Sequence, residues 1–300
     1  MELSSIVQTL LNGILLGGIY ATVALAVSLI WGIVKVVHIG YGAMCMLAAY
    51  LTYWLYMGYG VEPFASLILT IPIFFVLSCI IQGVLIRPIF KKTGQFDIGL
   101  VSLIILFGVA IFLEGLMLGL WTSDPRAISI TYFGASQIWI GSIAVSVVKL
   151  LTFITGIICF LFVYLFMQRT RLGKAIRAVS QNKDAAALMG VNTNYAYMLA
   201  FGITGILAAV TGMMISILFT VWASGYWTWI VKSFMIVALG GVGSVFGTLI
   251  AALILGTIES MTGLVFRFVY SQVIGVIILV LIIYIRPGVG LFGKKEVSGS

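Results

Sequence analysis

The sequence contains little charge, one histidine and three cysteines. Charged residues make up 8% of the 300 residues and hydrophobic residues 62%, whereas a soluble domain is about 25% charged and about 45 to 50% apolar. A water-soluble fold could not bury so much apolar surface, which excludes an ordinary soluble enzyme or binding domain. His38 is the single histidine, so a multi-histidine metal site lacks its ligands, and a Ser-His-Asp triad has no convincing parts beyond His38. We therefore predict no metal site, no catalytic residue and no enzymatic activity.

The cysteines and the net charge carry little functional signal of their own. Cys45, Cys79 and Cys159 all lie in apolar stretches without metal-ligand spacing, which favours small buried side chains. The formal net charge is +8, but a nucleic-acid-binding protein would gather its basic residues on a soluble face with interleaved aromatics. Here the basic residues stand between apolar runs, so they indicate membrane sidedness and not nucleic-acid binding.

Apolar runs of membrane-spanning length follow one another along most of the chain. A helix needs about 20 apolar residues to cross the hydrocarbon core. Short polar or Gly/Pro-marked breaks place spans near 6–34, 40–58, 63–86, 97–120, 143–167 and 195–220, with a further apolar segment over 227–286. The first run is too long for a signal peptide and has no basic residues before it, so it is kept as a helix. The pattern predicts an all-α polytopic membrane protein, one domain over 1–300, with about eight or nine transmembrane helices.

Most of the 16 Lys and Arg residues gather in four groups. The groups are Lys35; Arg87, Lys91 and Lys92; Arg169, Arg171, Lys174, Arg177 and Lys183; and Arg286, Lys294 and Lys295. The positive-inside rule assigns all four groups to the cytoplasm. The N-terminus is then outside, the C-terminus is cytoplasmic and the loop 121–142 is external. The remaining basic residues, Arg126, Lys149, Lys232 and Arg267, are expected near the opposite ends of spans.

This sidedness requires an odd number of crossings after residue 220. A break at Gly240-Gly241-Val242-Gly243-Ser244 gives two short helices before a last span over 265–285, which satisfies the requirement. Glycine reaches positive φ without steric cost, and non-helical backbone at membrane depth must be covered by protein or line a water-filled cavity. The break is thus a candidate functional region near 240–247. The alternative is close helix packing through the GxxxG pair Gly243 and Gly247.

Few polar side chains inside the predicted spans are candidates for chemistry. Glu114 and Glu259 are functional candidates because an ionisable group in lipid is costly; the alternative is a carboxyl bonded to a neighbouring helix. His38 lies at the break between the first two spans, where it could hydrogen-bond exposed backbone or act in transport. The stretch from Gly288 resembles a phosphate-binding loop, but Lys295 stands where that motif needs Ser or Thr. We therefore expect this chain to bind no ATP.

Residues 168–194 form a long basic segment that is predicted to contain two short helices. Apolar residues of the first fall at positions i, i+3, i+4 and i+7: Leu172, Ala175, Ile176 and Val179. In the second, Asn182 suits the N-cap, Asp184 the first turn and Gly190 the C-terminal stop. Helices this short are marginal in isolation. They therefore need a docking partner, either the membrane surface or another protein.

The chain resembles the LivH/LivM-type permeases, the membrane subunits of branched-chain amino-acid ABC importers, in four motifs that cover nearly its whole length. The motifs are Asn12-Gly13 with Gly17 to Ala21; Thr170, Gly173, Ala175, Arg177, Ala178, Asn182, Ala186, Gly190, Val191 and Asn192; Leu239 to Ser244 with Gly247, Gly256 and Glu259; and Arg286-Pro287-Gly288 with Gly290 to Gly293. Their order and spacing together are specific to the family.

The resemblance implies a permease in the plasma (inner) membrane of a prokaryote. Its implied partners are a second permease subunit, two ATP-binding subunits that use ATP and magnesium, and an extracytoplasmic solute-binding protein. The segment 168–194 would couple to the ATPase through Arg171, Gly173, Arg177, Ala178, Asn182, Ala186, Leu188 and Gly190. The expected translocation pathway includes Asn12, His38, Tyr41, Glu114, Gly240, Gly241, Gly243 and Glu259.

One motif departs from the family pattern and leaves the solute open. The family commonly has Asn-x-Ala-His-Gly-Glu/Asp after the first span, where this chain has His38-Ile39-Gly40-Tyr41-Gly42-Ala43. Branched-chain amino acids are the first expectation, and another amino acid, a short amide, urea or another small polar solute are the others. Two alternatives to an importer subunit are an ion-coupled secondary carrier that uses Glu114 or Glu259 and a non-transporting membrane scaffold.

Overall fold

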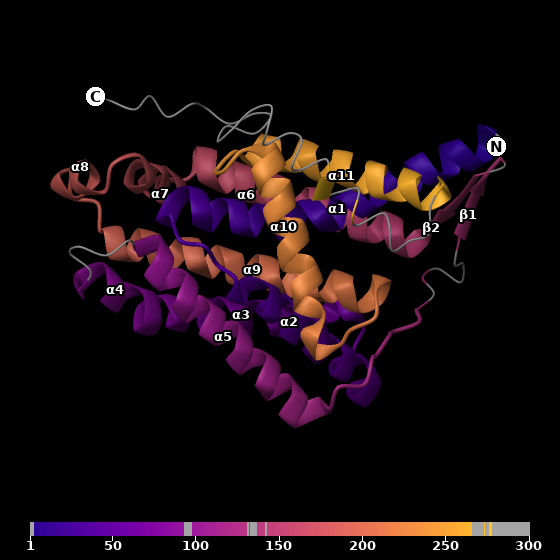
Figure 1. The fold of residues 1–300 in the computed structure, drawn as a ribbon, viewed down its shortest axis with the longest axis horizontal. Helices are drawn as coiled ribbons and strands as arrows, with labels where there is room; N and C mark the ends of the chain where they lie inside the picture. Colours follow the sequence, from indigo (N-terminus) through magenta and orange to yellow (C-terminus); the bar gives the residue numbers. More distant parts are fainter. Residues whose placement is uncertain are drawn as a thin grey trace. The chain divides into compact units, whose positions relative to one another are not determined.

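The computed structural model describes residues 3–92, 98–130, 132, 137–141, 143–265, 273, 276 and 277. Most of the predicted span 265–285, the predicted external residue Arg267 and the whole C-terminal motif from Arg286 lie outside these residues. Helices make up most of the described chain (Figure 1).

The long helices follow the predicted spans closely. They are α1 (Leu3–Val34), α2 (Gly40–Tyr59), α3 (Pro63–Ile80), α5 (Ile98–Trp121), α6 (Val147–Arg169), α9 (Thr193–Leu218), α10 (Tyr226–Gly240) and α11 (Val245–Val265). Shorter elements are the π-helix η1 (Ile81–Ile86), α4 (Arg87–Lys92), α7 (Arg171–Gln181), α8 (Lys183–Leu188) and the 3-10 helix η2 (Ala223–Gly225). Within the described residues, six helical stretches are long and apolar enough to cross a membrane. The predicted all-α polytopic architecture is confirmed.

One predicted helix boundary is wrong. Residues 143–146 were expected to open a span, but they form strand β2 (Ile143–Ser146), which pairs antiparallel with β1 (Gln137–Ile140). The Gln8 side chain holds β2 in place, because its Nε2 donates to the Ala144 carbonyl at 2.5 Å and its Oε1 accepts from the Ala144 amide at 2.8 Å. Because Gln8 engages both the amide and the carbonyl of Ala144, these backbone groups are not available for a helix. Helix α6 therefore begins only at Val147.

The described residues cluster into two compact units, which are considered separately. The first draws on Met1–Ser28, Ile130–Phe160 and Val231–Ser300, and the second on Leu29–Ser129 and Leu161–Ile230. The assignment of 1–300 to one domain stays a prediction.

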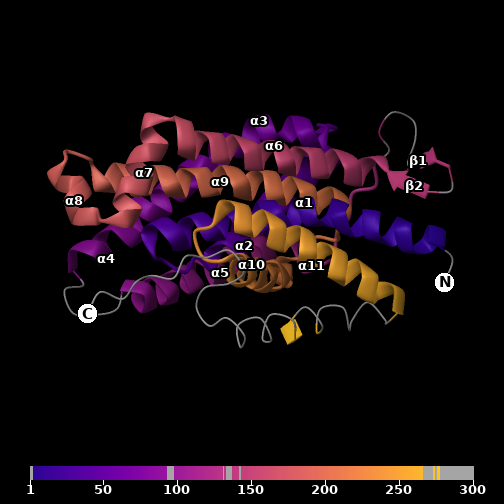
Figure 2. The ribbon, with the colours of Figure 1, turned by 90° about the horizontal axis from the view of Figure 1, so that it is seen from above.

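In the first unit, α1 and α11 lie side by side (Figures 1 and 2) and touch through their backbones. A Cβ atom at Gly13 would lie 2.6 Å from the Cα of Thr257, and one at Gly256 would lie 2.6 Å from the Gly13 carbonyl oxygen. Gly18 of α1 and Gly156 of α6 meet in the same way. Because small residues let helix backbones approach closely in lipid, these glycines bring α1, α6 and α11 together.

In the second unit, α9 packs mainly against α2 and α3. Gly205 of α9 faces the backbone of Phe74, and a Cβ at Gly212 would lie 2.5 Å from the Cys45 carbonyl oxygen. Figures 1 and 2 show α4, α7 and α8 at the same end of this unit, where α9 also begins. Two of the predicted cytoplasmic basic groups, carried by α4 and by α7 with α8, therefore share one end of the unit.

Candidate functional site

The break between α10 and α11 is present where it was predicted. Gly241 has φ +92° and Gly243 has φ +76°, a region that favours glycine. The Ser244 amide donates to the Gly241 carbonyl at 3.1 Å and closes a turn. The Ser244 hydroxyl then accepts from the Gly247 amide at 3.1 Å, so Ser244 caps the start of α11.

Close helix packing also occurs at the break, but through a different glycine pair from the predicted one. A Cβ atom at Gly240 would lie 2.5 Å from the carbonyl oxygen of Gly247, and one at Gly247 would collide with the Gly240 carbonyl oxygen. Gly243 takes no part in this contact, because it forms the turn. Turn formation and close packing are therefore both present, each served by its own glycines.

Glu259 belongs to a closed polar network in the first unit. Its Oε1 lies 2.7 Å from the Lys232 ammonium, and its Oε2 accepts from the Tyr20 hydroxyl at 2.6 Å. Lys232 also donates to the Tyr20 oxygen at 2.6 Å and lies 4.6 Å from the Tyr20 ring centroid. The Lys232 and Glu259 side chains are only 11% and 7% exposed, so the pair is neutral, satisfied and buried. It bonds α1, α10 and α11 together.

The structure corrects the expected position of Lys232. It was predicted near the external end of a span, but it lies inside α10 and pairs with an intramembrane carboxylate. A lysine whose charge is compensated in this way can stay within a membrane helix, which removes the need for contact with water.

Glu114, the other acidic candidate, has a different environment, within the second unit. Its Oε1 accepts from the Ser224 hydroxyl at 2.6 Å, and its Oε2 accepts from the Tyr226 hydroxyl at 3.0 Å. Among the residues that the structure describes, no lysine or arginine forms an ion pair with it. Glu114 is partly exposed and Ser224 is exposed, whereas Tyr226 is buried. Its carboxyl group is held in place but carries no compensating charge.

His38 does not play the backbone-capping role that was expected of its side chain. The residue is buried, and neither ring nitrogen has a hydrogen-bond partner in the described part of the chain. Its ring lies among aromatic groups, with centroid distances of 5.4 Å to Phe201 and 6.3 Å to Tyr41. Only its backbone carbonyl accepts a bond, from the Tyr41 amide at 3.3 Å. A transport role for His38 stays a prediction.

The remaining predicted pathway residues lie in both units. In the first unit, the Asn12 side-chain oxygen accepts from the Lys149 ammonium at 3.1 Å. In the second, the Tyr41 hydroxyl lies 3.4 Å from the Thr211 hydroxyl. These side chains are satisfied by neighbouring helices, and their part in a pathway stays a prediction.

Helix α7 is fixed to the end of α6 by a cap and a glycine. The Thr170 hydroxyl accepts from the Gly173 amide at 2.9 Å, and a Cβ at Gly173 would lie 2.6 Å from the Cα of Met167. The buried face of α7 is Gly173, Ile176 and Val179. Leu172 was predicted on that face but is 40% exposed. The close packing of Gly173 against α6 sets the rotation of α7 and leaves Leu172 outside the contact.

Helix α8 has the predicted caps at both ends. Asn182 Oδ1 accepts from the Asp184 amide at 3.0 Å and the Ala185 amide at 2.9 Å. Gly190 has φ +82°, and the amides of Gly190 and Val191 donate to the carbonyls of Ala187 and Ala186, both at 3.0 Å. This is the Schellman pattern of helix termination.

Between these caps, α8 presents two large apolar side chains. Leu188 is 90% exposed and Met189 84% exposed, while Ala186 packs inward. Of the other predicted coupling residues, Arg171 is exposed and Ala178 is half-buried, and Arg177 donates to the Gln168 side chain at 2.7 Å. An apolar pair this exposed beside basic residues is typical of a docking surface.

The family described as branched-chain amino acid transport system / permease component matches residues 9–284. The chain belongs to this family. It is 29% identical to the high-affinity branched-chain amino acid transport system permease protein BraD of Pseudomonas aeruginosa, over 99% of both chains. It is 26% identical to the corresponding protein LivH of Escherichia coli K12, over 97% of this chain and 96% of that one. No solved structure matches the chain significantly.

A weaker likeness covers less of the chain. The ribose import permease protein RbsC of Escherichia coli K12 is 30% identical over 43% of this chain and 42% of its own. The permease family thus agrees with the resemblance read from the four motifs, and the chain is a multi-pass transport permease.

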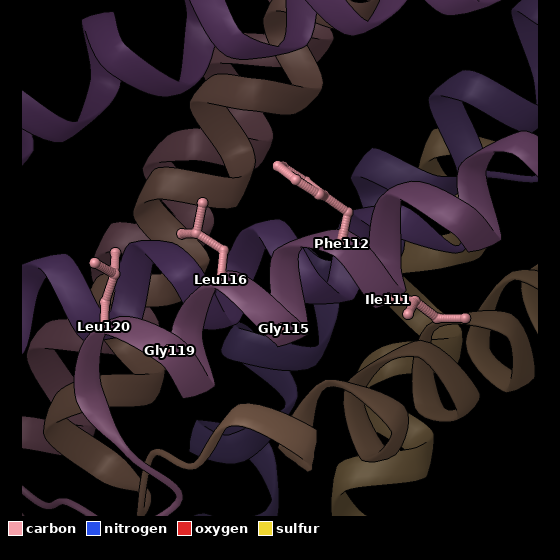
Figure 3. A pocket seen from close by; sticks show the side chains of 6 residues that line it. All are labelled: Ile111, Phe112, Gly115, Leu116, Gly119 and Leu120. Carbon is pink, nitrogen blue, oxygen red and sulfur yellow. The ribbon is translucent and has the colours of Figure 1, made fainter.

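An apolar groove on α5 does not suit a polar solute. It has a volume of about 440 Å³ and is lined by Ile111, Phe112, Gly115, Leu116, Gly119 and Leu120. In Figure 3, Phe112, Leu116 and Leu120 project from one side of the helix, and Ile111 points away from them. Such an apolar lining is suited to contact with the hydrocarbon chains of lipids.

Four side chains bond the two acidic candidates, and sequence reasoning identified none of them in this role: Tyr20, Lys232, Ser224 and Tyr226. An intramembrane carboxylate calls for a compensating basic residue, but no pattern in the sequence shows that Lys232 is the residue that pairs with Glu259. Ser224 and Tyr226 gave no comparable signal, because a hydroxyl at the start of a short helix is common.

Proposed function

We propose that this permease is the membrane-spanning subunit of an ABC importer, which moves a branched-chain amino acid or a related small polar solute. ATP and magnesium are used by two separate ATP-binding subunits. The complete importer also contains a second permease subunit and an extracytoplasmic solute-binding protein, in the inner membrane of a prokaryote. The family and its named relatives support an importer subunit over an ion-coupled carrier.

The observation that carries this proposal is the surface formed by Leu188 and Met189. Burying a leucine or methionine side chain contributes about 1.5 to 3 kcal/mol. Because Leu188 and Met189 are almost fully exposed in this chain, burial of the pair against a protein partner would contribute that free energy to binding. The caps at Asn182 and Gly190 fix the pair's position. We infer that it docks on the ATP-binding subunit, with the segment 168–194 and the C-terminus in the cytoplasm and the N-terminus outside.

Short connections join α7 and α8 to the membrane helices α6 and α9, so a movement of α7 and α8 can be transmitted to them. Helix α6 ends at Arg169 and α7 begins at Arg171, while α8 ends at Leu188 and α9 begins at Thr193. Asn192 caps α9 by accepting from the Tyr195 amide at 3.1 Å. Because these joints are short and capped, closure of the ATP-binding subunits would tilt α6 and α9. That tilt is the step of alternating access that exposes the pathway to one side and then the other.

The test is the double variant Leu188→Asp/Met189→Asp in the reconstituted importer. We expect ATP-dependent uptake to fall by at least about tenfold and the ATP-binding subunit to dissociate, since each lost apolar contact is worth about one factor of ten or more. The matched control is Met57→Asp, which charges an apolar side chain that is 51% exposed at the end of α2. Unchanged uptake with the ATP-binding subunit still bound would refute the docking role.

A further inference from the structure

The two intramembrane glutamates differ in what remains for a ligand to bind. Glu259 is neutralised by Lys232, and both of its oxygens are engaged within a buried network. Glu114 receives one hydroxyl hydrogen bond on each oxygen and no ion pair from the described residues. A carboxylate has about four acceptor positions, so Glu114 keeps room for two further donors on its accessible side.

Glu114 is also positioned more firmly than a surface carboxylate. The Tyr226 side chain that holds Oε2 is buried. A Cβ at Gly42 of α2 would lie 2.9 Å from the Tyr226 carbonyl oxygen, so α2 fixes the backbone that carries the tyrosine. Ser224, in η2, holds the other oxygen from the exposed side. The two hydroxyl donors therefore fix the position of both carboxyl oxygens.

An aromatic surface adjoins this carboxylate. Trp227 stacks on Tyr226 with ring centroids 5.1 Å apart and also contacts Phe107 at 5.9 Å. Its side chain is 43% exposed. An anion with spare acceptors beside an accessible aromatic face suits a solute that carries an ammonium group and an apolar part.

From this geometry we propose that Glu114 binds the ammonium group of the transported solute, with Ser224 and Tyr226 as positioning residues and Trp227 beside the solute's apolar part. This inference rests on the proposed transport function and narrows it. The solute is a primary amine such as an α-amino acid, which sets it apart from a sugar, an amide or urea.

The test measures equilibrium binding of radiolabelled leucine to the purified complex of permease and ATP-binding subunits, without the solute-binding protein. Competitors are 3-methylbutylamine, which lacks the carboxylate of leucine, and 4-methylpentanoate, which lacks its amine. In the wild type, the amine should compete and the carboxylate should not. Glu114→Gln should weaken leucine binding roughly 10- to 100-fold, the range for a hydrogen bond to a charged group, and Glu114→Asp should restore part of it.

The matched control is Glu62→Gln, which neutralises an exposed glutamate whose side chain makes no capping bond at the start of α3. Tyr226→Phe and Ser224→Ala should each weaken leucine binding less than Glu114→Gln does. Thermal unfolding of every variant separates lost binding from lost folding. Glu114→Gln is expected to stay folded, because the glutamine oxygen can still accept a hydroxyl hydrogen bond.

Each outcome decides the matter. Equal leucine affinity in wild type and Glu114→Gln, equal competition by the two analogues, or a wild type that binds neither leucine nor the amine overturns the ammonium site. Binding that depends on Glu114 without ATP-driven uptake in vesicles upholds the site and overturns the importer function. If ATP-driven uptake occurs and Glu114→Gln leaves it unchanged, the importer function is upheld and the ammonium site is overturned.

Discussion

Replacing Lys232 by methionine should destabilise the permease far more than replacing Lys232 and Glu259 together. The single change leaves the Glu259 carboxylate buried with a neutral neighbour, and removing one partner of a buried ion pair costs about 3 to 5 kcal/mol. The side-chain exposures of 11% and 7% mean that water can screen little of this cost. In Lys232→Met/Glu259→Gln, no charge remains, and the Tyr20 hydroxyl can still donate to the glutamine oxygen.

We therefore expect the double variant to lie within about 1 to 2 kcal/mol of the wild type, because replacing both members of a buried pair is often nearly neutral. The coupling energy between the two positions would then be about 2 kcal/mol or more. The assay is unfolding of the purified chain in mixed micelles by increasing denaturing detergent, followed by circular dichroism. Additive effects of Lys232→Met and Glu259→Gln would show that the two side chains do not stabilise each other.

Two glycine substitutions test the close contacts in the same assay. Gly247→Ala should cost about 1 to 3 kcal/mol, the range for overpacking, because the new Cβ meets the carbonyl oxygen of Gly240. The control is Gly263→Ala, whose new Cβ meets no atom of the described residues, and it should be neutral or stabilising. Gly173→Ala should loosen α7 from α6 at a similar cost, measured as faster proteolysis within 171–190, whereas Gly115→Ala on α5, with no atom within 4 Å, should leave proteolysis unchanged. Equal behaviour of a variant and its control would contradict the corresponding contact.

Much of the fold could be predicted because lipid imposes strong rules on a chain. Apolar length gave the spans from α1 to α9, and the positive-inside rule with crossing parity predicted the break at 240–244. The caps of α8 were readable because Asn182 and Gly190 act through local backbone geometry. Each of these signals is confined to neighbouring residues or to simple counting along the chain.

What could not be predicted depends on contacts between distant segments. The Tyr20–Lys232–Glu259 network joins three helices, and no periodicity shows which residue compensates which. The exposure of Leu172 follows from the fit of Gly173 against α6, and the strand at 143–146 follows from Gln8 far earlier in the chain. Local patterns gave the elements, and side-chain partners across elements decided the details that were wrong.

The short length of α10 has a consequence for how the chain enters the membrane during synthesis. Its 15 residues rise about 22 Å, less than the hydrocarbon thickness of about 30 Å, and Lys232 adds an insertion cost of about 2.5 to 3.5 kcal/mol near the helix centre. The translocation channel should therefore release α10 into lipid poorly on its own. Helix α11 emerges from the ribosome next and brings Glu259, so the two segments are expected to partition as one hairpin whose opposite charges enter together.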